Sequence, residues 1–268
     1  MSNTVNIFMN KFTYIINKEK LRLNILIIFV LSITINQHYG NIGVNPFDNF
    51  AIFNSGYNVL NNKLPFRDYW TVHGPLVDYL QSSFFYVLGI NWKSFVLHAS
   101  FFNFIISIIT YLTLIKLRLN VSYCLFYSLL LSVLFYPTVG TPFADFHSLL
   151  FSLIGIFLLI LAIKTKKNVY WFLLPIILTL GFLSKQVPTS YISFIIIIFS
   201  FYYLVLNFNK RIVISVVVSL FTILLLVLSF SKFYSIDYED FINQYILFSS
   251  TIGRERLAAG FLFPIEFK

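Results

Sequence analysis

Long apolar runs separated by short polar segments fill most of the chain, and they constrain its fold more than any other feature. Residues 189–206 read TSYISFIIIIFSFYYLVL, and a comparable run covers residues 212–232. A helix needs about 20 predominantly apolar residues to cross the hydrocarbon core of a bilayer. Because a segment in lipid must satisfy its own backbone hydrogen bonds, such runs form helices. The sequence therefore predicts an all-α integral membrane protein.

The pattern predicts about seven transmembrane helices within one polytopic membrane domain that covers residues 1–268. The predicted spans are residues 23–37, 94–115, 121–137, 146–163, 169–184, 189–206 and 212–232. Residues 75–89 read PLVDYLQSSFFYVLG, contain Asp78 and Gln81, and are too short for a span. We therefore predict an interfacial or re-entrant helix there, with Asp78 on its solvent-exposed face.

The charges orient these spans and narrow the possible partners. Only 11% of the residues are charged, against roughly 25% in soluble domains. The net charge is +9, but the basic residues form short clusters between apolar runs, so we expect no nucleic-acid partner. With a cytoplasmic N-terminus, the inner segments hold 11 of the 19 basic residues and one of the 10 acidic ones, in agreement with the positive-inside rule. The 11 basic residues are Lys11, Lys18, Lys20, Arg22, Lys116, Arg118, Lys164, Lys166, Lys167, Lys210 and Arg211.

In this orientation, residues 38–93 form one large external loop, and the C-terminal segment 233–268 is external as well. The loop is predicted to hold a helix over residues 48–61, because its aromatic residues fall at helical spacing. An aromatic-rich turn, LPFRDYW at 64–70, and the helix at 75–89 follow. The inner loops are short, so we expect any chemistry on the outer face.

Acidic side chains on the outer side are the first candidates for a site. Asp48 is a candidate N-cap of the helix that follows it and a candidate general base at the mouth of the bundle, and the two roles are compatible. Asp68 either pairs with Arg67 or Lys63 or contributes to the site. Asp145 lies at the outer end of the span predicted over residues 146–163. A carboxylate there is costly unless it caps the helix or faces a polar cavity or a partner.

A histidine and several cations are the second group of candidates. His147 either orients a substrate or a carboxylate, or is partly buried without such a role. Lys185 and Gln186 interrupt a long apolar tract, where Lys185 either binds a lipid phosphate or snorkels from a span end. Arg254 and Arg256 either grip a phosphate or carboxylate through their planar forks or pair with the glutamate between them.

The sequence lacks the motifs of several common enzyme classes. It contains no Walker A loop, no GxGxxG, no HExxH and no CxxC, so ATP hydrolysis, dinucleotide redox chemistry and zinc catalysis are not indicated. The one cysteine, Cys124, lies in an apolar run and cannot form a disulfide within the chain. Carboxylates at 48, 68 and 145 are capable of binding a divalent cation, although no ligand spacing demands one.

The order of these features resembles that of the GT-C glycosyltransferases. The first span is followed at once by a large external loop with an early aspartate, in FDNFAIFNSGYNVLNNKLPFRDYW and HGPLVDYLQSSFFYVLG. These segments are similar to the loop of the protein-mannosyltransferase-like and lipid A aminoarabinose transferase-like group. SKQ after the fifth span and QYILFSSTIGRERL extend the resemblance over about residues 20–256. Since family chains are longer, we expect a truncated or split member.

The resemblance implies that the chain takes a sugar from a polyprenyl-phosphate carrier and transfers it to a glycan, lipid or protein acceptor outside the bacterial cytoplasmic membrane. It assigns the role of catalytic base to Asp48. The family's Asp-Glu pair reads here as Asp48-Asn49, so Asp145 or Asp68 is the candidate for the second acid. We take Asp145 as catalytic and assign no metal ligand. The predicted substrate-binding residues are Asp68, Tyr69, Trp70, His73, His147, Lys185, Gln186, Arg254 and Arg256.

Two alternatives stay open. A transporter or flippase for a lipid-linked glycan would carry charged residues near mid-span, and residues 149–232 contain no acid. A non-catalytic, truncated membrane protein predicts that the outer-face polar groups do not converge in space.

Overall fold

The computed structural model describes residues 2–43, 49–252 and 254–255. The chain divides into two compact units. The first unit consists of residues 1–45 and 96–141, and the second unit consists of residues 46–95 and 142–268. Two of the predicted site residues, Asp48 and Arg256, lie outside the described residues.

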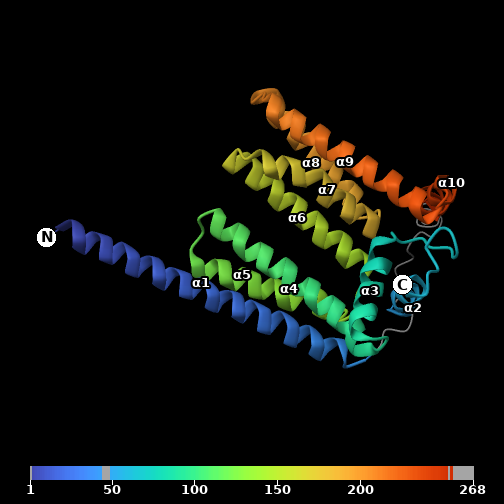
Figure 1. The fold of residues 1–268 in the computed structure, drawn as a ribbon, viewed down its shortest axis with the longest axis horizontal. Helices are drawn as coiled ribbons and strands as arrows, with labels where there is room; N and C mark the ends of the chain where they lie inside the picture. Colours follow the sequence, from blue (N-terminus) through green and yellow to red (C-terminus); the bar gives the residue numbers. More distant parts are fainter. Residues whose placement is uncertain (1, 44–48, 253, 256–268) are drawn as a thin grey trace, which may run out of the picture. The chain divides into compact units, whose positions relative to one another are not determined.

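Every long element among the described residues is a helix, which confirms the all-α prediction (Figure 1). The elements are α1 (Ser2–Gly40), α2 (Asn49–Leu60), α3 (Leu76–Leu88), α4 (Trp92–Lys116), α5 (Val121–Leu134), the 3-10 turn η1 (Tyr136–Thr138), α6 (Ala144–Thr165), α7 (Asn168–Ser184), α8 (Thr189–Leu206), α9 (Lys210–Tyr234), α10 (Tyr238–Phe241) and the π-helical segment η2 (Ile242–Leu247).

Six helical stretches in the described part of the chain are long and apolar enough to cross a membrane. They are Glu19–Gly40, Trp92–Lys116, Val121–Thr138, Ala144–Thr165, Thr189–Leu206 and Lys210–Tyr234. The remaining predicted span, at residues 169–184, forms the apolar helix α7, which has 17 residues and is shorter than the other six. The chain is therefore a multi-pass membrane protein.

The two short helices of the loop between the first two spans form close to where we predicted them. α2 begins at Asn49, and α3 begins directly after Pro75 and ends before Gly89, whose φ of 82° is left-handed. The prediction for Asp78 was wrong, because its side chain has no exposed surface. The buried face of α3 mixes apolar and polar residues, so α3 does not turn all its polar groups outward. This face consists of Val77, Asp78, Gln81, Ser82 and Phe85.

In the first unit, polar side chains join α1 to its neighbours. The Asn36 amide nitrogen lies 2.9 Å from the Ser100 hydroxyl and 3.2 Å from the Gly140 carbonyl oxygen. The Asn103 amide donates to the carbonyl oxygens of Ser32 and Ser132, at 3.1 and 2.8 Å. Lipid tails are as apolar as leucine side chains, so hydrogen bonds of this kind contribute to helix association in a membrane.

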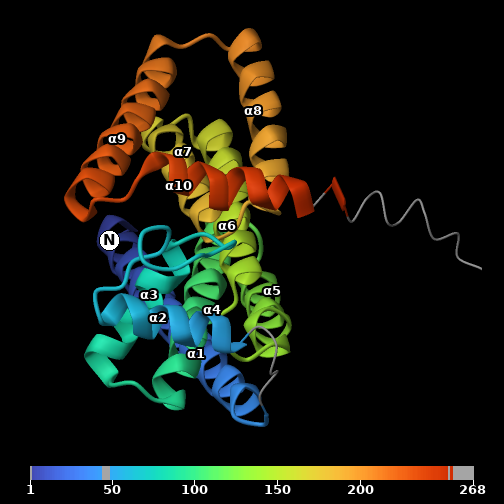
Figure 2. The ribbon, with the colours of Figure 1, turned by 90° about the vertical axis from the view of Figure 1, so that its right-hand side faces the viewer.

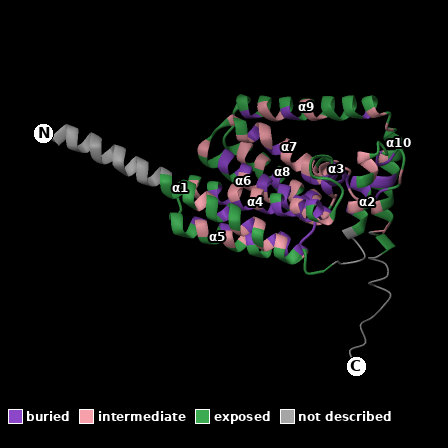
Figure 3. Ribbon diagram, turned by 60° about the horizontal axis from the view of Figure 1, so that its bottom comes forward, coloured by how far each residue is buried: buried purple, intermediate pink, exposed green. Residues whose placement is uncertain are grey.

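In the second unit, α6 packs against α7 and α8, α7 also packs against α9, and α3 packs against α2 and α7. Phe53 of α2 makes edge-to-face ring contacts with Phe85 of α3 and with Phe95. Figure 2 shows α10 and the helical residues after it running crosswise to α8 and α9. Only 11% of the most apolar 18-residue stretch is buried in α8 and also in α9, and Figure 3 shows the exposed residues along α9. Apolar surface of this kind suits contact with lipid.

Candidate functional site

Four of the predicted site residues, Asp145, His147, Lys185 and Gln186, lie where α6 begins and α7 ends. α7 stops at Ser184, and Lys185 after it has an extended backbone. The Gly74 N–H donates to the Ser184 carbonyl oxygen at 2.9 Å, so the HGP segment of the long loop docks on the start of SKQ. Gly74 is required by this close approach, because a Cβ built on it would overlap the Leu183 carbonyl group.

Asp145 and Lys185 form an ion pair across this junction. The Lys185 Nζ lies 2.7 Å from an Asp145 carboxylate oxygen, although the two residues are 40 positions apart in sequence. The Asp145 side chain is 41% exposed and the Lys185 side chain is 37% exposed, so an incoming ligand can reach both. Asp145 is not the N-cap of α6, since Phe143 occupies that position without a side-chain cap. Asp145 instead lies in the first turn, where the helix dipole favours an acid.

Buried hydroxyl groups of α6 and α8 form hydrogen bonds next to this junction. Ser148 of α6 donates to the Lys185 carbonyl oxygen at 3.0 Å and lies 2.6 Å from the Thr189 hydroxyl of α8. Ser152, one turn further along α6, lies 2.9 Å from the same hydroxyl. His147 is fully buried, and its Nδ1 lies 3.0 Å from the Phe143 carbonyl oxygen. His147 is therefore directed into the unit, and the reading of a buried histidine fits its position.

Gln186 connects the junction to the segment after α9. Its amide nitrogen donates to the Tyr245 carbonyl oxygen at 2.5 Å and to the Ser249 hydroxyl at 3.1 Å, and lies 3.4 Å from the Val72 carbonyl oxygen. Tyr245 is fully buried and donates its hydroxyl to the Phe182 carbonyl oxygen. Burial raises the pKa of Tyr245 above its ordinary value, so the hydroxyl stays protonated. Gln186 thus has three backbone or side-chain contacts in the structure.

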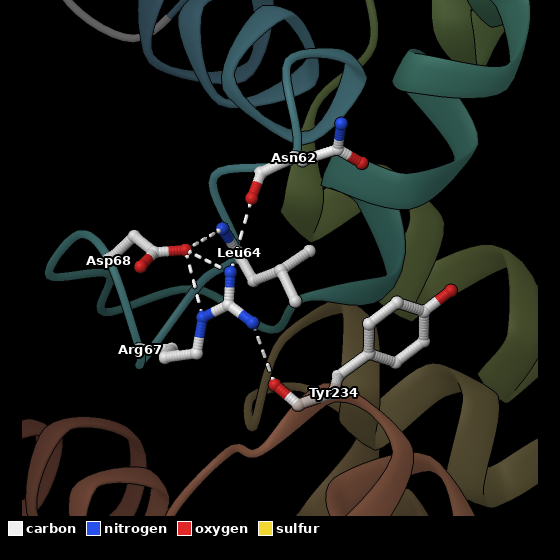
Figure 4. A network of polar contacts seen from close by, with 5 residues as sticks. All are labelled: Asn62, Leu64, Arg67, Asp68 and Tyr234. Atoms are coloured by element: carbon white, nitrogen blue, oxygen red, sulfur yellow. Dashed lines mark hydrogen bonds and ion pairs between the residues drawn. The ribbon is translucent and has the colours of Figure 1, made fainter.

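The turn at residues 64–70 carries a second ion pair, between Arg67 and Asp68 (Figure 4). The Asp68 carboxylate accepts from the Arg67 guanidinium at 2.7 Å and from the Leu64 N–H at 2.7 Å. These two contacts, the guanidinium first, hold the pKa of Asp68 below its ordinary value. Arg67 also donates to the carbonyl oxygens of Tyr234 at 2.8 Å and Asn62 at 3.2 Å. The structural reading of Asp68 as a partner of Arg67 is confirmed.

Tyr69 and His73 converge on the buried Asp78. The Tyr69 hydroxyl donates to one Asp78 oxygen at 2.9 Å, and the His73 Nε2 lies 2.8 Å from the other. Desolvation, with the Asp78 charge as the next cause, raises the pKa of Tyr69. Sequence reasoning missed Asp78 as a member of this cluster. Its partners lie five and nine residues earlier in an irregular loop, where no helical or strand spacing predicts a contact.

Two further predicted residues, Trp70 and Arg254, also belong to the second unit. Trp70 is 57% exposed and contacts the Phe248 ring edge-to-face, with centroids 5.2 Å apart. Arg254 is exposed in the helical end of the described chain. Sequence reasoning also missed Gln244, whose amide group lies 3.4 Å from the Thr71 N–H and 3.3 Å from the Phe66 carbonyl oxygen. Within the described residues, no group of three or more His, Cys, Asp or Glu side chains gathers as metal ligands do.

An apolar cavity of about 310 Å³ lies beside the junction within the second unit. Its walls come from α3, α7 and α9 and from residues 65–66, 236–238 and 241, and include Leu76, Leu183 and Phe230. Tyr79 also lines the cavity, and its ring meets Phe230 edge-to-face. Burial raises the pKa of Tyr79. An apolar cavity with few polar groups suits a hydrocarbon chain rather than a free sugar.

The helices define a multi-pass membrane protein in which the Asp145–Lys185 ion pair lies where α6 begins and α7 ends. Residues 72–235, more than half of the chain, match the family described as dolichyl-phosphate-mannose-protein mannosyltransferase. The chain belongs to this GT-C-like family of membrane glycosyltransferases, whose members use lipid-linked sugar donors. The resemblance to GT-C enzymes is thereby confirmed. No curated protein and no solved structure matches the chain.

Proposed function

We propose that the chain transfers a sugar from a polyprenyl-phosphate-linked donor to a glycan, lipid or protein acceptor on the outer face of the bacterial cytoplasmic membrane. The half-exposed ion pair between Asp145 and Lys185 carries this proposal. It provides a cation for a lipid phosphate next to a carboxylate, at a junction that also receives the HGP segment. Family membership supports a lipid-linked donor.

The reaction is an inverting displacement at the anomeric carbon. Asp48 accepts the proton of an acceptor hydroxyl as general base, and the acceptor oxygen forms a bond to the anomeric carbon. The bond from that carbon to the phosphate oxygen breaks, and its electron pair leaves with the polyprenyl phosphate. Negative charge therefore grows on the leaving phosphate in the transition state, and fixed cations that face it lower the barrier.

Lys185 is the cation that we place on the leaving phosphate, with Arg254 or Arg256 as further donors. In the free protein Asp145 neutralises Lys185 and holds its ammonium group at the junction. When the phosphate binds, Lys185 has two anionic partners, and Asp145 keeps the lysine in place. Asp145 is also the candidate for the second acid of the site, because it lies beside Lys185, whereas Asp68 lies on the turn at residues 64–70.

Aromatic side chains of the loop would hold the sugar. Trp70 exposes more than half of its surface, so its ring is available for stacking on a sugar face. Tyr69 is half-buried with its hydroxyl on Asp78, so its contact with a sugar would come from the ring edge. The apolar cavity beside α3, α7 and α9 would take part of the isoprenoid chain of the donor. The positive-inside charge pattern supports an outer position for this end of the helices.

The test is a transfer assay with the full chain in proteoliposomes. Labelled sugar is supplied either on polyprenyl phosphate or on a nucleotide, with membrane extract as the acceptor and mannose as the first sugar of a panel. We expect label to move from the lipid-linked donor alone, with release of polyprenyl phosphate. Asp48→Asn should lower the rate by at least 100-fold, whereas the exposed control Asp240→Asn should leave it unchanged.

Three results would contradict the proposal. Transfer from the nucleotide donor would assign another donor class, and full activity of Asp48→Asn would remove this residue from the base role. Movement of the intact lipid-linked sugar across the membrane, without cleavage of its phosphate bond, would identify a flippase instead.

A further inference from the structure

The buried carboxylate of Asp78 is not used in the reaction proposed above. It lies in the first turn of α3, without any exposed surface. Each of its two oxygens has a donor within hydrogen-bond distance, the Tyr69 hydroxyl at 2.9 Å and the His73 ring at 2.8 Å. A buried carboxylate is unfavourable unless it is paired and hydrogen-bonded, and an apolar side chain is often at least as stabilising in its place. Asp78 therefore calls for an explanation beyond packing.

The partners of Asp78 lie on the segment that reaches the candidate site. The His73 ring lies between Asp78 on one side and the Thr71 hydroxyl, 3.2 Å from its Nδ1, on the other. Both ring nitrogens thus have a partner, and the ring has one orientation. The next residue, Gly74, donates its N–H to the Ser184 carbonyl oxygen. One peptide unit therefore separates the histidine held by Asp78 from the backbone contact that precedes Lys185.

We propose that Asp78 is a positioning residue for Lys185. It fixes the His73 ring, the fixed ring holds the Gly74 amide on Ser184, and this contact sets where Lys185 leaves the end of α7. The inference rests on the proposed function, because it assigns to Asp78 a task within the same phosphate site. Lys185 has to face a charge that develops only in the transition state, and a displacement of about 1 Å at such a group can reduce a rate by about 100-fold.

Two variants separate the charge and the acceptors of Asp78. Asp78→Leu removes both acceptors and the charge and keeps the branching of the side chain, so it tests the complete loss of the contact. Asp78→Asn keeps one carbonyl oxygen as an acceptor and removes the charge. Asp240→Asn on the exposed helix α10 serves as the matched control.

The first measurement is hydrogen–deuterium exchange of the Gly74 amide, which needs no substrate. We expect Asp78→Leu to accelerate this exchange at least 10-fold, Asp78→Asn to have a smaller effect, and amides within α8 to keep their protection in all variants. Equal protection of the Gly74 amide in the wild type and Asp78→Leu would overturn the proposal. Loss of protection throughout the second unit would also overturn it, because Asp78 would then stabilise the whole unit.

The second measurement is the transfer assay with separate kcat and KM values. We expect Asp78→Leu to lower kcat by 10- to 100-fold and to change KM for the donor by less than 3-fold, with Asp78→Asn intermediate. A wild-type kcat in Asp78→Leu would overturn the positioning role even if the amide exchange changed. If the wild type transferred no sugar, the proposed function would fail, and the exchange of the Gly74 amide would still decide whether Asp78 fixes this contact.

Discussion

The contact between the HGP segment and the end of α7 makes Gly74 a sensitive position. Gly74 is buried, and a Cβ added to it would overlap the backbone carbonyl of Leu183. Both sides of this contact are main chain, so no flexible side chain can move away. The substitution Gly74→Ala therefore has to separate the two segments, which lengthens the hydrogen bond from the Gly74 N–H to the Ser184 carbonyl oxygen.

The expected cost follows from three contributions. Forcing a methyl group into a packed contact costs about 1–3 kcal/mol, and loss of the hydrogen bond adds about 0.5–1.5 kcal/mol. Replacing glycine by alanine reduces the conformational entropy of the unfolded chain, which offsets about 0.4–1 kcal/mol of this cost. The net loss in the free energy of unfolding is about 2 kcal/mol. At about 2–4 °C per kcal/mol, Tm should fall by about 4–8 °C.

Thermal unfolding in detergent, followed by tryptophan fluorescence, measures this effect. Gly43→Ala is the matched control, because a Cβ on Gly43 meets nothing within 4 Å. We expect the control to keep the wild-type Tm within about 1 °C, since surface substitutions away from special contacts change stability by less than about 0.5 kcal/mol. An unchanged Tm in Gly74→Ala would refute the reasoning, because it would mean that the two segments do not touch as described.

Two further predictions concern hydrogen bonds in the two units. Asn36→Leu removes the contacts of Asn36 with the Ser100 hydroxyl and the Gly140 carbonyl oxygen. The free energy of unfolding, measured by denaturant titration, should fall by about 0.6–2 kcal/mol. A variant as stable as the wild type would contradict this prediction. The folded-state pKa of Asp68 is lowered by Arg67, so the ion pair stabilises the turn above the ordinary pKa of 3.8 and loses this effect as the pH falls through the lowered value. The Tm difference between wild type and Asp68→Asn should therefore be largest near pH 7 and shrink below pH 3.8, whereas a constant difference would contradict the assignment.

The helices could be predicted from the sequence because a helix that crosses a lipid bilayer needs about 20 predominantly apolar residues. α8 begins and ends at the predicted residues 189 and 206, between a proline and a short polar segment. The prediction of a helix end was less accurate near a proline. The span predicted over 121–137 stops as an α-helix at Leu134 and continues as a 3-10 turn, since Pro137 has no backbone N–H with which to extend the α-helical hydrogen bonds.

The candidate site could be predicted only in its residue types and in its local pairs. Asp68 finds its partner at the neighbouring position, so the pairing with Arg67 is visible in the sequence. The partner of Lys185 is 40 residues away on another helix, and nothing in either local pattern connects the two. Asp78 was misplaced because a polar residue on a short helix is usually solvated, whereas here a loop supplies two donors to it.

The central claim is that Lys185 holds the phosphate of the lipid carrier, and binding of polyprenyl phosphate to the full chain tests it most directly. Native mass spectrometry of wild type, Lys185→Met and Asp145→Asn gives the affinities, with the exposed Lys232→Met on α9 as the control. We expect Lys185→Met to weaken binding at least 10-fold, which corresponds to about 1.4 kcal/mol. Asp145→Asn should bind at least as well as wild type, because its lysine is no longer shared. Wild-type affinity in Lys185→Met would contradict the account.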